Sequence, residues 1–350
     1  MTEKPHSNSM IKRALILITL ISGMAHADTS VVYQGEKGPG AGKHIVFLAS
    51  DHEYRSEETC PALARILAKH YGFKCTVVFG VDKEGFIEAG SSRIAGLEAL
   101  KDADLFFIFA RFLHPPDEQM AAIESYLDRG GPVVGLRTSS HAFKIPGNAT
   151  YAKYDFRSKT EGYQNGFGHQ VLGNTWVGHY GQNHKQGTRI LLVPEQKQHV
   201  ILTGVGDNAF CNAGGYVGKP GPDFTVLAKS QPLVSMDPSA KPDPKKPPMP
   251  CTWTRHYTAK DGAKYRVFHS TQGASEDILD DNYRRMIING TLWALKMEQH
   301  IRPDLDISFV GPYHPSTFSF AGHAKRVKPE DLAGWESPIM PLREDKPEAP

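Results

Sequence analysis

The chain has 350 residues, 40 of them basic and 38 acidic, and its formal net charge is +2. This balance excludes a strongly basic surface, so no nucleic-acid partner is expected. Hydrophobic residues make up 40% of the chain, enough for a sizeable core in one large domain or two small ones. Sixteen histidines direct attention to a functional site, because histidine titrates near neutrality and is the commonest metal ligand.

The N-terminal segment has the pattern of an export signal. Positive charge at 10–13 precedes a short apolar run at 14–21, and a small-x-small motif follows at 25–27. We therefore expect a signal peptide over 1–27, a mature chain that begins at Asp28, and a periplasmic or extracellular location. The apolar run is too short to span a bilayer, so no membrane span is expected after cleavage. The alternative is an uncleaved anchor, or a start of translation at Met10.

The first half of the chain alternates predicted strands with predicted helices. A polar, Gly-rich lead-in over 28–43 comes first. Continuous apolar runs predict buried strands at 44–49, 75–79, 104–109 and 131–134. Helices are predicted from about Thr59 to the cap at Gly72, with Pro61 in the first turn, and at 94–100 and 116–129. This alternation predicts a doubly wound, mostly parallel sheet with helices on both faces.

The second half is less regular. Glycine, histidine and aromatic residues are frequent over 144–187, and strands are predicted at 188–193, 223–227 and 265–269. A segment rich in proline and lysine at 237–250 predicts an exposed, extended excursion. The clearest helix is predicted over 281–297, where apolar residues recur at helical spacing. We therefore expect one α/β domain over 44–300 and a C-terminal extension over 301–350.

Four cysteines leave the question of disulfides open. An even number, as in Cys60, Cys75, Cys211 and Cys251, fits an oxidising compartment because every thiol can pair. Four cysteines allow three connectivities, and the sequence does not choose among them. The alternative is a set of buried free thiols.

The segment 135–143 has the pattern of a sharp strand-to-helix turn. Small and polar residues follow an apolar strand there, as in a nucleophile elbow, which lifts one side chain above the carboxyl edge of a sheet. The residue at that position is Arg137, which cannot act as a nucleophile but can bind a carboxylate, a phosphate or sugar hydroxyls. A Ser139–His141 dyad would require the loop to fold back on itself, so acyl transfer is not expected.

Polar side chains gather at the predicted carboxyl ends of several strands. Because open α/β folds bind ligands at this edge, the ends define a candidate site for an oxygen-rich small molecule. The candidate catalytic residues are Asp51, His52, Arg137 and His141. The candidate ligand-binding residues are Glu53, Arg111, Ser139, His269 and Gln272. The alternative is that these residues are ordinary loop starts and helix caps.

Three further histidines form a candidate metal set. His169, His179 and His184 lie within sixteen residues among glycines and could approach one zinc ion together with His52 or His141. Their spacing matches no compact zinc motif, so no cofactor is certain and a divalent metal such as zinc is the one cofactor considered. The alternative is that these histidines face solvent or bond to the backbone.

Several motifs, in their order and spacing, indicate a family. They lie at 51–52, 135–141, 172–176, 178–179, 199–204, 267–273 and 289–295. With these motifs the chain resembles the trehalose-utilisation (ThuA-like) family over about 44–300. The resemblance implies a flavodoxin-like fold of the class I glutamine amidotransferase type, without glutaminase chemistry, and a role in the catabolism of sugars, including disaccharides oxidised at a ring carbon. Relatives often carry His at the elbow position occupied here by Arg137, and His at the position occupied here by Ala274.

Together these features favour an exported protein of carbohydrate metabolism that acts on a sugar or keto-sugar as a hydrolase, lyase or isomerase. A histidine would move the proton, Arg137 would bind an oxygen-rich group, and Asp51 or Glu53 would orient a histidine. The expected partner is a small-molecule carbohydrate, and the sequence is compatible with a homo-oligomer. Two alternatives stay open, namely a non-catalytic periplasmic sugar-binding or scaffold module and a zinc-dependent hydrolase.

Overall fold

A computed structural model describes residues 1–2 and 29–340 of the chain. The cleavage site and apolar run of the predicted signal peptide, 1–27, therefore lie outside the described residues. Across the described ranges, no helix is both long and apolar enough to cross a membrane.

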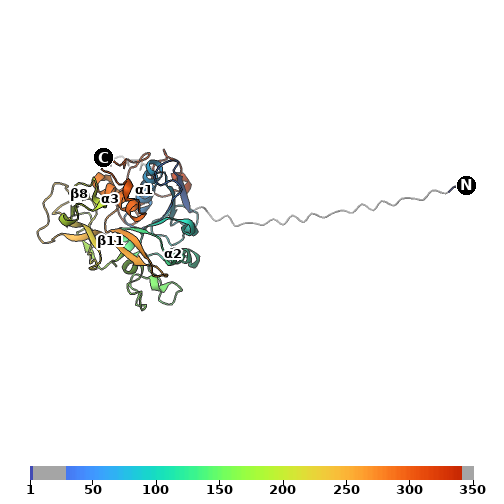
Figure 1. Cartoon of the computed structure of the whole chain (residues 1–350), viewed down its shortest axis with the longest axis horizontal. Coiled ribbons are helices and arrows are strands. Elements are labelled where there is room, and N and C mark those ends of the chain that lie inside the picture. Colours follow the sequence, from blue (N-terminus) through green and yellow to red (C-terminus); the bar gives the residue numbers. More distant parts are fainter. Residues whose placement is uncertain (3–28, 341–350) are drawn as a thin grey trace, which may run out of the picture.

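The centre of the fold is a ten-stranded sheet in the order β1-β3-β2-β4-β5-β12-β11-β10-β7-β8 (Figure 1). Strands β3, β2, β4, β5 and β12 run parallel, and the remaining neighbours are antiparallel. The strand bounds are β1 Ser30–Gln34, β2 His44–Ser50, β3 Lys74–Phe79, β4 Leu105–Ala110, β5 Val133–Leu136, β7 Thr188–Leu192, β8 Ala209–Cys211, β10 Thr225–Pro232, β11 Met249–Thr258 and β12 Lys264–Ser270. Strands β6 (His179–Tyr180) and β9 (Gly215–Tyr216) form a separate pair.

Helices cover both faces of this sheet. Helices α1 (Ser56–Tyr71) and α3 (Asp281–Ala294) lie on one face, and α2 (Asp117–Arg129) lies on the other (Figure 1). Side chains of β2 alternate between the faces, because successive residues of a strand point in opposite directions. Ile45 and Phe47 pack into the cluster beneath α1 and α3, whereas Val46 and Leu48 pack toward α2. The predicted α/β fold with a central parallel sheet is confirmed.

Several predicted boundaries need correction. Helix α1 begins at Ser56, so Pro61 lies inside the helix, not in its first turn. The short helix predicted at 94–100 is a 3-10 helix over Leu97–Asp102. Helix α3 ends at Ala294, before the 297 predicted, and Lys296 beyond it has a left-handed φ of +59°.

Two segments predicted to be irregular contribute strands. The lead-in over 28–43 contains β1, which pairs antiparallel with β3 at the edge of the sheet. The excursion over 237–250 ends inside β11, whose pairing with β10 is irregular where Pro250 lies opposite Lys229. A proline in a strand removes a backbone donor, which is why the sequence pattern concealed the start of β11.

All four cysteines are buried free thiols, so the pairing that an oxidising compartment allows is not formed in this structure. Burial raises the pKa of each thiol above its ordinary value. The cysteines therefore act as small apolar core residues.

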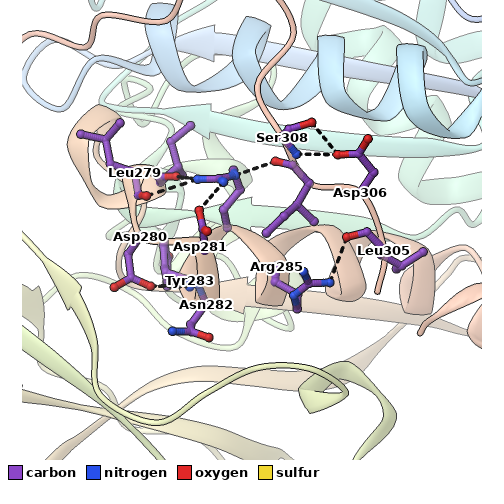
Figure 2. Close-up of polar contacts among 12 residues, drawn as sticks. Leu279, Asp280, Asp281, Asn282, Tyr283, Arg285, Leu305, Asp306 and Ser308 are labelled. Atoms are coloured by element: carbon purple, nitrogen blue, oxygen red, sulfur yellow. Dashed lines mark hydrogen bonds and ion pairs between the residues drawn. The ribbon is translucent and has the colours of Figure 1, made fainter. Parts of the chain in front are cut away.

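The C-terminal extension packs against the domain. Arg284 of α3 donates to the backbone carbonyls of Ile307 and Ile278. Figure 2 shows Arg285 of the same helix donating to the carbonyl of Leu305. Farther along, Arg65 of α1 donates to the carbonyls of Leu332 and Ser337. Because buried guanidinium groups hold its backbone at both points, the extension over 301–340 has a fixed course across α1 and α3.

Candidate functional site

The carboxyl ends of β2, β4 and β5 meet at one edge of the sheet, and the loops that follow them form the candidate site. Strand β2 leads to Asp51, His52 and Glu53, β4 leads to Arg111, and β5 leads to Arg137. The parallel register β2-β4-β5 places these loops side by side. The sequence predicted this convergence correctly.

The predicted elbow is a strained turn. Strand β5 passes directly into a 3-10 helix over Arg137–His141, and Arg137 has a left-handed φ of +48°. Arg55 after β2, Phe112 after β4, and His184 share this conformation, with φ values of +65°, +54° and +62°. A residue other than glycine loses about 1–2 kcal/mol in this region. Strained residues cluster at functional sites, so Arg55, Phe112 and Arg137, which follow β2, β4 and β5, support the choice of this edge.

Arg137 lies beneath the site with no exposed surface. Its Nη1 donates to the carbonyl of Thr271 at 3.0 Å and to Oε1 of Gln272 at 2.8 Å. The guanidinium carbon lies 3.7 Å from the ring centroid of Tyr54 and 5.0 Å from that of Tyr216. The observed contacts make Arg137 a support for two tyrosines, and its direct contact with a ligand stays a prediction.

Two candidate residues bond mainly to backbone groups. Oδ1 of Asp51 accepts from the backbone N–H groups of Glu53 and Tyr54 and so shapes the turn after β2. The hydroxyl of Ser139 lies 2.7 Å from the carbonyls of both Ile108 and Leu136. Both side chains are fully buried, and these bonds give them structural roles.

A network of polar contacts connects the ion pair of Arg111 and Glu53 to His179. Arg111 pairs with Glu53, and the side chains of both are more than nine-tenths buried. Nδ2 of Asn183 donates to Oε1 of Glu53 at 3.2 Å and to the hydroxyl of Tyr54 at 2.7 Å. That hydroxyl lies 3.4 Å from Nε2 of His179. Neither Asp51 nor Glu53, which were predicted to orient a histidine, is hydrogen-bonded to one in this network. Instead the hydroxyl of Tyr54 is the group placed to orient His179.

Aromatic rings connect three histidines, two of which contact the same pair of rings. The ring centroids of Trp176 and Tyr216 each lie 5.4 Å from that of His141, and 5.7 and 5.6 Å from that of His179. Phe112 connects the third, with its centroid 5.0 Å from His141 and 6.2 Å from His52. The structure thus brings together the predicted residues His52 and His141 with His179, which the sequence placed in a metal set.

These imidazoles are neutral near pH 7. Burial is the main cause that lowers the pKa of His52, His141 and His179 below the ordinary value of 6.5, and the positive charge of Arg111 lowers all three further. Nδ1 of His141 lies 3.0 Å from the hydroxyl of Ser140, while its Nε2 has no hydrogen-bond partner within residues 29–340. A neutral ring with a free nitrogen can accept a proton or a hydrogen bond.

Two other candidates lie deeper. His269 is fully buried, its Nδ1 lies 2.8 Å from the carbonyl of Gly135, and burial lowers its pKa to about 3. Gln272 is also fully buried and accepts from Arg137. Both belong to the layer that supports the elbow.

The candidate metal set is not gathered. His169 lies in a helical turn whose carbonyls accept from Arg255, and His184 stacks on Phe318 with centroids 4.4 Å apart. Within the described part of the chain, no group of three His, Cys, Asp or Glu side chains is placed to hold a metal ion. Of the three, only His179 lies among the residues of the candidate site.

The C-terminal extension reaches the site, which the sequence did not predict. The ring centroid of Phe318 lies 5.1 Å from that of Tyr54, and the ring centroid of Phe320 lies 5.4 Å from that of His52. The sequence also missed Trp176 and Tyr216, which come from the irregular middle of the chain. Trp176 lies in the motif at 172–176, and aromatic residues among glycines in that region were the signal for Tyr216. No local pattern marks Phe318 or Phe320.

No protein-family model and no curated protein matches this sequence. Among solved structures, a protein from Bacteroides uniformis, provisionally named ThuA-like, is similar at 13% identity and a TM-score of 0.44, over 77% of this chain and 98% of that one. A provisionally named ThuA-like protein from Parabacteroides merdae is similar at 13% identity and a TM-score of 0.42, over 79% and 96%. The family name of both agrees with the one that the sequence motifs indicate.

Proposed function

We propose that this protein is an exported, ThuA-like protein that binds a sugar or keto-sugar at the edge formed by β2, β4 and β5 and transfers a proton with a neutral histidine. The observation that carries the proposal is a cluster of three histidines beside the ion pair of Glu53 and Arg111. His141 and His179 contact the same two aromatic rings, and Phe112 connects His141 to His52. The sequence resemblance to a family of carbohydrate metabolism supports the class of ligand.

The chemistry of the site suits a polyhydroxylated ligand. The carboxylate of Glu53 accepts hydrogen bonds, and the guanidinium of Arg111 donates them in a planar fork. The hydroxyl of Tyr216 is buried and has no hydrogen-bond partner among residues 29–340, so it can donate to a ligand oxygen. Burial raises the pKa of Tyr216 well above its ordinary value, which keeps this hydroxyl protonated.

His141 is the best candidate for the proton-transferring base. Its Nε2 is unpaired but buried, so a sugar must reach beneath the edge of the sheet to contact it. There Nε2 can take a proton from a sugar hydroxyl, or from a carbon beside a ring ketone, where the carbonyl acidifies the C–H bond. Tyr216, whose ring centroid lies 5.4 Å away, can donate to the oxygen that gains charge. Because the pKa of His141 is well below 6.5, this base stays unprotonated at mildly acidic pH.

A turnover assay tests this proposal. Trehalose, and trehalose carrying a ketone on a ring carbon, are incubated with the purified protein in D2O and followed by proton NMR. Free glucose without a vinylic signal indicates a hydrolase. Free glucose together with a vinylic signal indicates a lyase, because elimination expels glucose as the leaving group. Loss of a C–H signal by exchange without free glucose indicates an isomerase. His141→Gln keeps a hydrogen-bonding side chain without a basic nitrogen, and we expect it to lose about 100-fold or more of the rate. Equal rates for the wild type and for His141→Gln would refute the role of His141 as the base.

A specific feature also favours a non-catalytic sugar-binding module. The elbow carries Arg137 where a nucleophile would stand, and the hydroxyl of Ser139 bonds to backbone carbonyls. Covalent catalysis at the elbow is therefore unsupported, although proton transfer is not affected. Calorimetric binding of trehalose, with no change in its NMR spectrum after long incubation, would favour the binding module over the enzyme.

Export is proposed from the N-terminal pattern alone. Mass spectrometry of the protein recovered from the periplasm or medium of an expressing bacterium should give a chain that begins at Asp28. Recovery of a chain that begins at Met1, and only in the cytoplasm, would refute export.

A further inference from the structure

Phe320 is unusually exposed for an aromatic residue held in a fixed position. It exposes 60% of its surface, more than any other large hydrophobic side chain in the range 29–340. Burial of a phenylalanine side chain stabilises a protein by about 1.5–3 kcal/mol, so this position forgoes stability. Single exposed apolar side chains are common on protein surfaces, so the surroundings of this ring decide its role.

The ring of Phe320 lies at the candidate site. Its centroid is 5.4 Å from that of His52 and 5.3 Å from the guanidinium carbon of Arg111. Arg111 is the residue paired with Glu53, so the exposed aromatic face adjoins the polar groups suited to sugar hydroxyls. An apolar wall beside a few placed polar groups is the usual composition of a small-molecule site.

The chain on either side of Phe320 is firmly attached. Nη2 of Arg55 donates to the carbonyl of Ser319 at 2.8 Å and to its hydroxyl at 3.0 Å. Phe318, only 1% exposed, stacks on His184. Ser316 bonds to the carboxylate of Glu58 through its N–H at 2.8 Å and through its hydroxyl.

The turn after Phe320 is also fixed. Ala321 has a left-handed φ of +55°, and a Cβ at Gly322 would collide with Ser319 and with the guanidinium of Arg55. Any other residue here would displace the ends of the Ser319 and Arg55 side chains, so the close packing of this turn depends on glycine. These contacts fix the backbone of the segment 316–322, which exposes the ring of Phe320 to solvent.

We infer that Phe320 is a stacking wall of the site, which receives the apolar C–H face of a sugar ring while the residues after β2 and β4 bind its hydroxyls. This inference rests on the proposed function and assigns the C-terminal extension a direct part in recognition. A pyranose has one face of axial C–H groups and a rim of hydroxyls, which matches an aromatic ring beside an Arg–Glu pair.

Binding of trehalose, measured by calorimetry, tests the inference with a matched set of variants. Phe320→Ala should weaken binding about tenfold, since loss of one aromatic contact costs about 1.4 kcal/mol. Phe320→Trp should stay within about threefold of the wild type, and Phe320→Leu should fall between them. Val32→Ala removes a 49% exposed side chain on the edge strand β1, two strands away from β2, and should change nothing.

A second readout reports the ring itself. In the wild-type complex, the proton signals of the sugar face that stacks should shift upfield because they lie over an aromatic ring. This shift should be absent with Phe320→Leu and present with Phe320→Trp.

The outcomes separate the two proposals. If the wild type binds trehalose but Phe320→Ala binds within twofold and no upfield shift occurs, the stacking role is overturned and the proposed function stands. If the wild type binds neither trehalose nor its ring ketone, the proposed function fails and the stacking role fails with it.

Discussion

Arg137 offers a sharp test of the elbow, because its backbone is left-handed at a residue that is not glycine. We predict that Arg137→Gly is more stable than Arg137→Ala, although glycine normally costs about 0.5–1 kcal/mol relative to alanine. Both variants lose the bonds to Thr271 and Gln272, and two buried acceptors left unpaired cost about 2–6 kcal/mol in all. Only alanine also carries the penalty of about 1–2 kcal/mol for the φ of +48°.

Equilibrium unfolding in urea measures the free energy of unfolding of both variants. The glycine variant should be more stable by about 1 kcal/mol, after its entropic cost is subtracted from the penalty of the left-handed backbone. Ser125 provides the control, because it is exposed in the middle of α2 and Ser125→Gly should be less stable than Ser125→Ala by about 1 kcal/mol. If alanine is also the more stable residue at position 137, the strained elbow is wrong.

Three further predictions concern pH and the C-terminal segment. Burial lowers the folded-state pKa of His269 from 6.5 to about 3, so the free energy of unfolding falls by about 1.4 kcal/mol per pH unit as the pH drops below 6.5. His269→Asn should remove this dependence on pH from urea unfolding at pH 4.5–6.5, and an unchanged dependence would contradict the buried, neutral histidine. Burial and the charge of Glu58 raise the pKa of Glu57 to about 8, so stability is lost as the pH rises from 4.5 through 8. The free energy of unfolding of Glu57→Gln should therefore increase relative to that of the wild type between pH 5 and 8.5. A difference between the two proteins that does not change with pH would contradict the raised pKa. Ser316→Ala removes the hydroxyl that bonds to Glu58, so it should speed amide hydrogen exchange over 316–322 and weaken trehalose binding severalfold. Ser308→Ala, which loses only bonds to Asp306 and His70, should change neither. Equal effects of the two variants would contradict the attachment of the segment 316–322.

Local sequence patterns predicted the frame of the fold and of the site. The apolar runs of β2, β4 and β5 are buried on both faces of the sheet, so they read as strands without knowledge of their neighbours. Their carboxyl ends then place His52, Glu53, Arg111 and His141 at one edge. The elbow was predictable because small and polar residues directly follow a buried strand, which is the pattern of a sharp strand-to-helix turn.

The remaining features depend on contacts between distant parts of the chain. Phe320 reaches the site because Arg55, 265 positions earlier in the sequence, holds the adjacent residue Ser319. Tyr216 comes from a short strand that pairs only with β6. The burial of Arg137 depends on the tyrosine rings that enclose it, and no spacing in the sequence reports such an enclosure.

The central claim is that one sugar ring binds at the edge formed by β2, β4 and β5. A crystal structure of the protein soaked with trehalose, at a concentration well above the dissociation constant, tests it most directly. We predict density for a pyranose stacked on Phe320, within hydrogen-bond distance of Glu53 or Arg111, and next to His52 or His179. Density at a different surface, such as the 370 Å³ cavity lined by His70 and Arg302, with none at this edge, would contradict the claim.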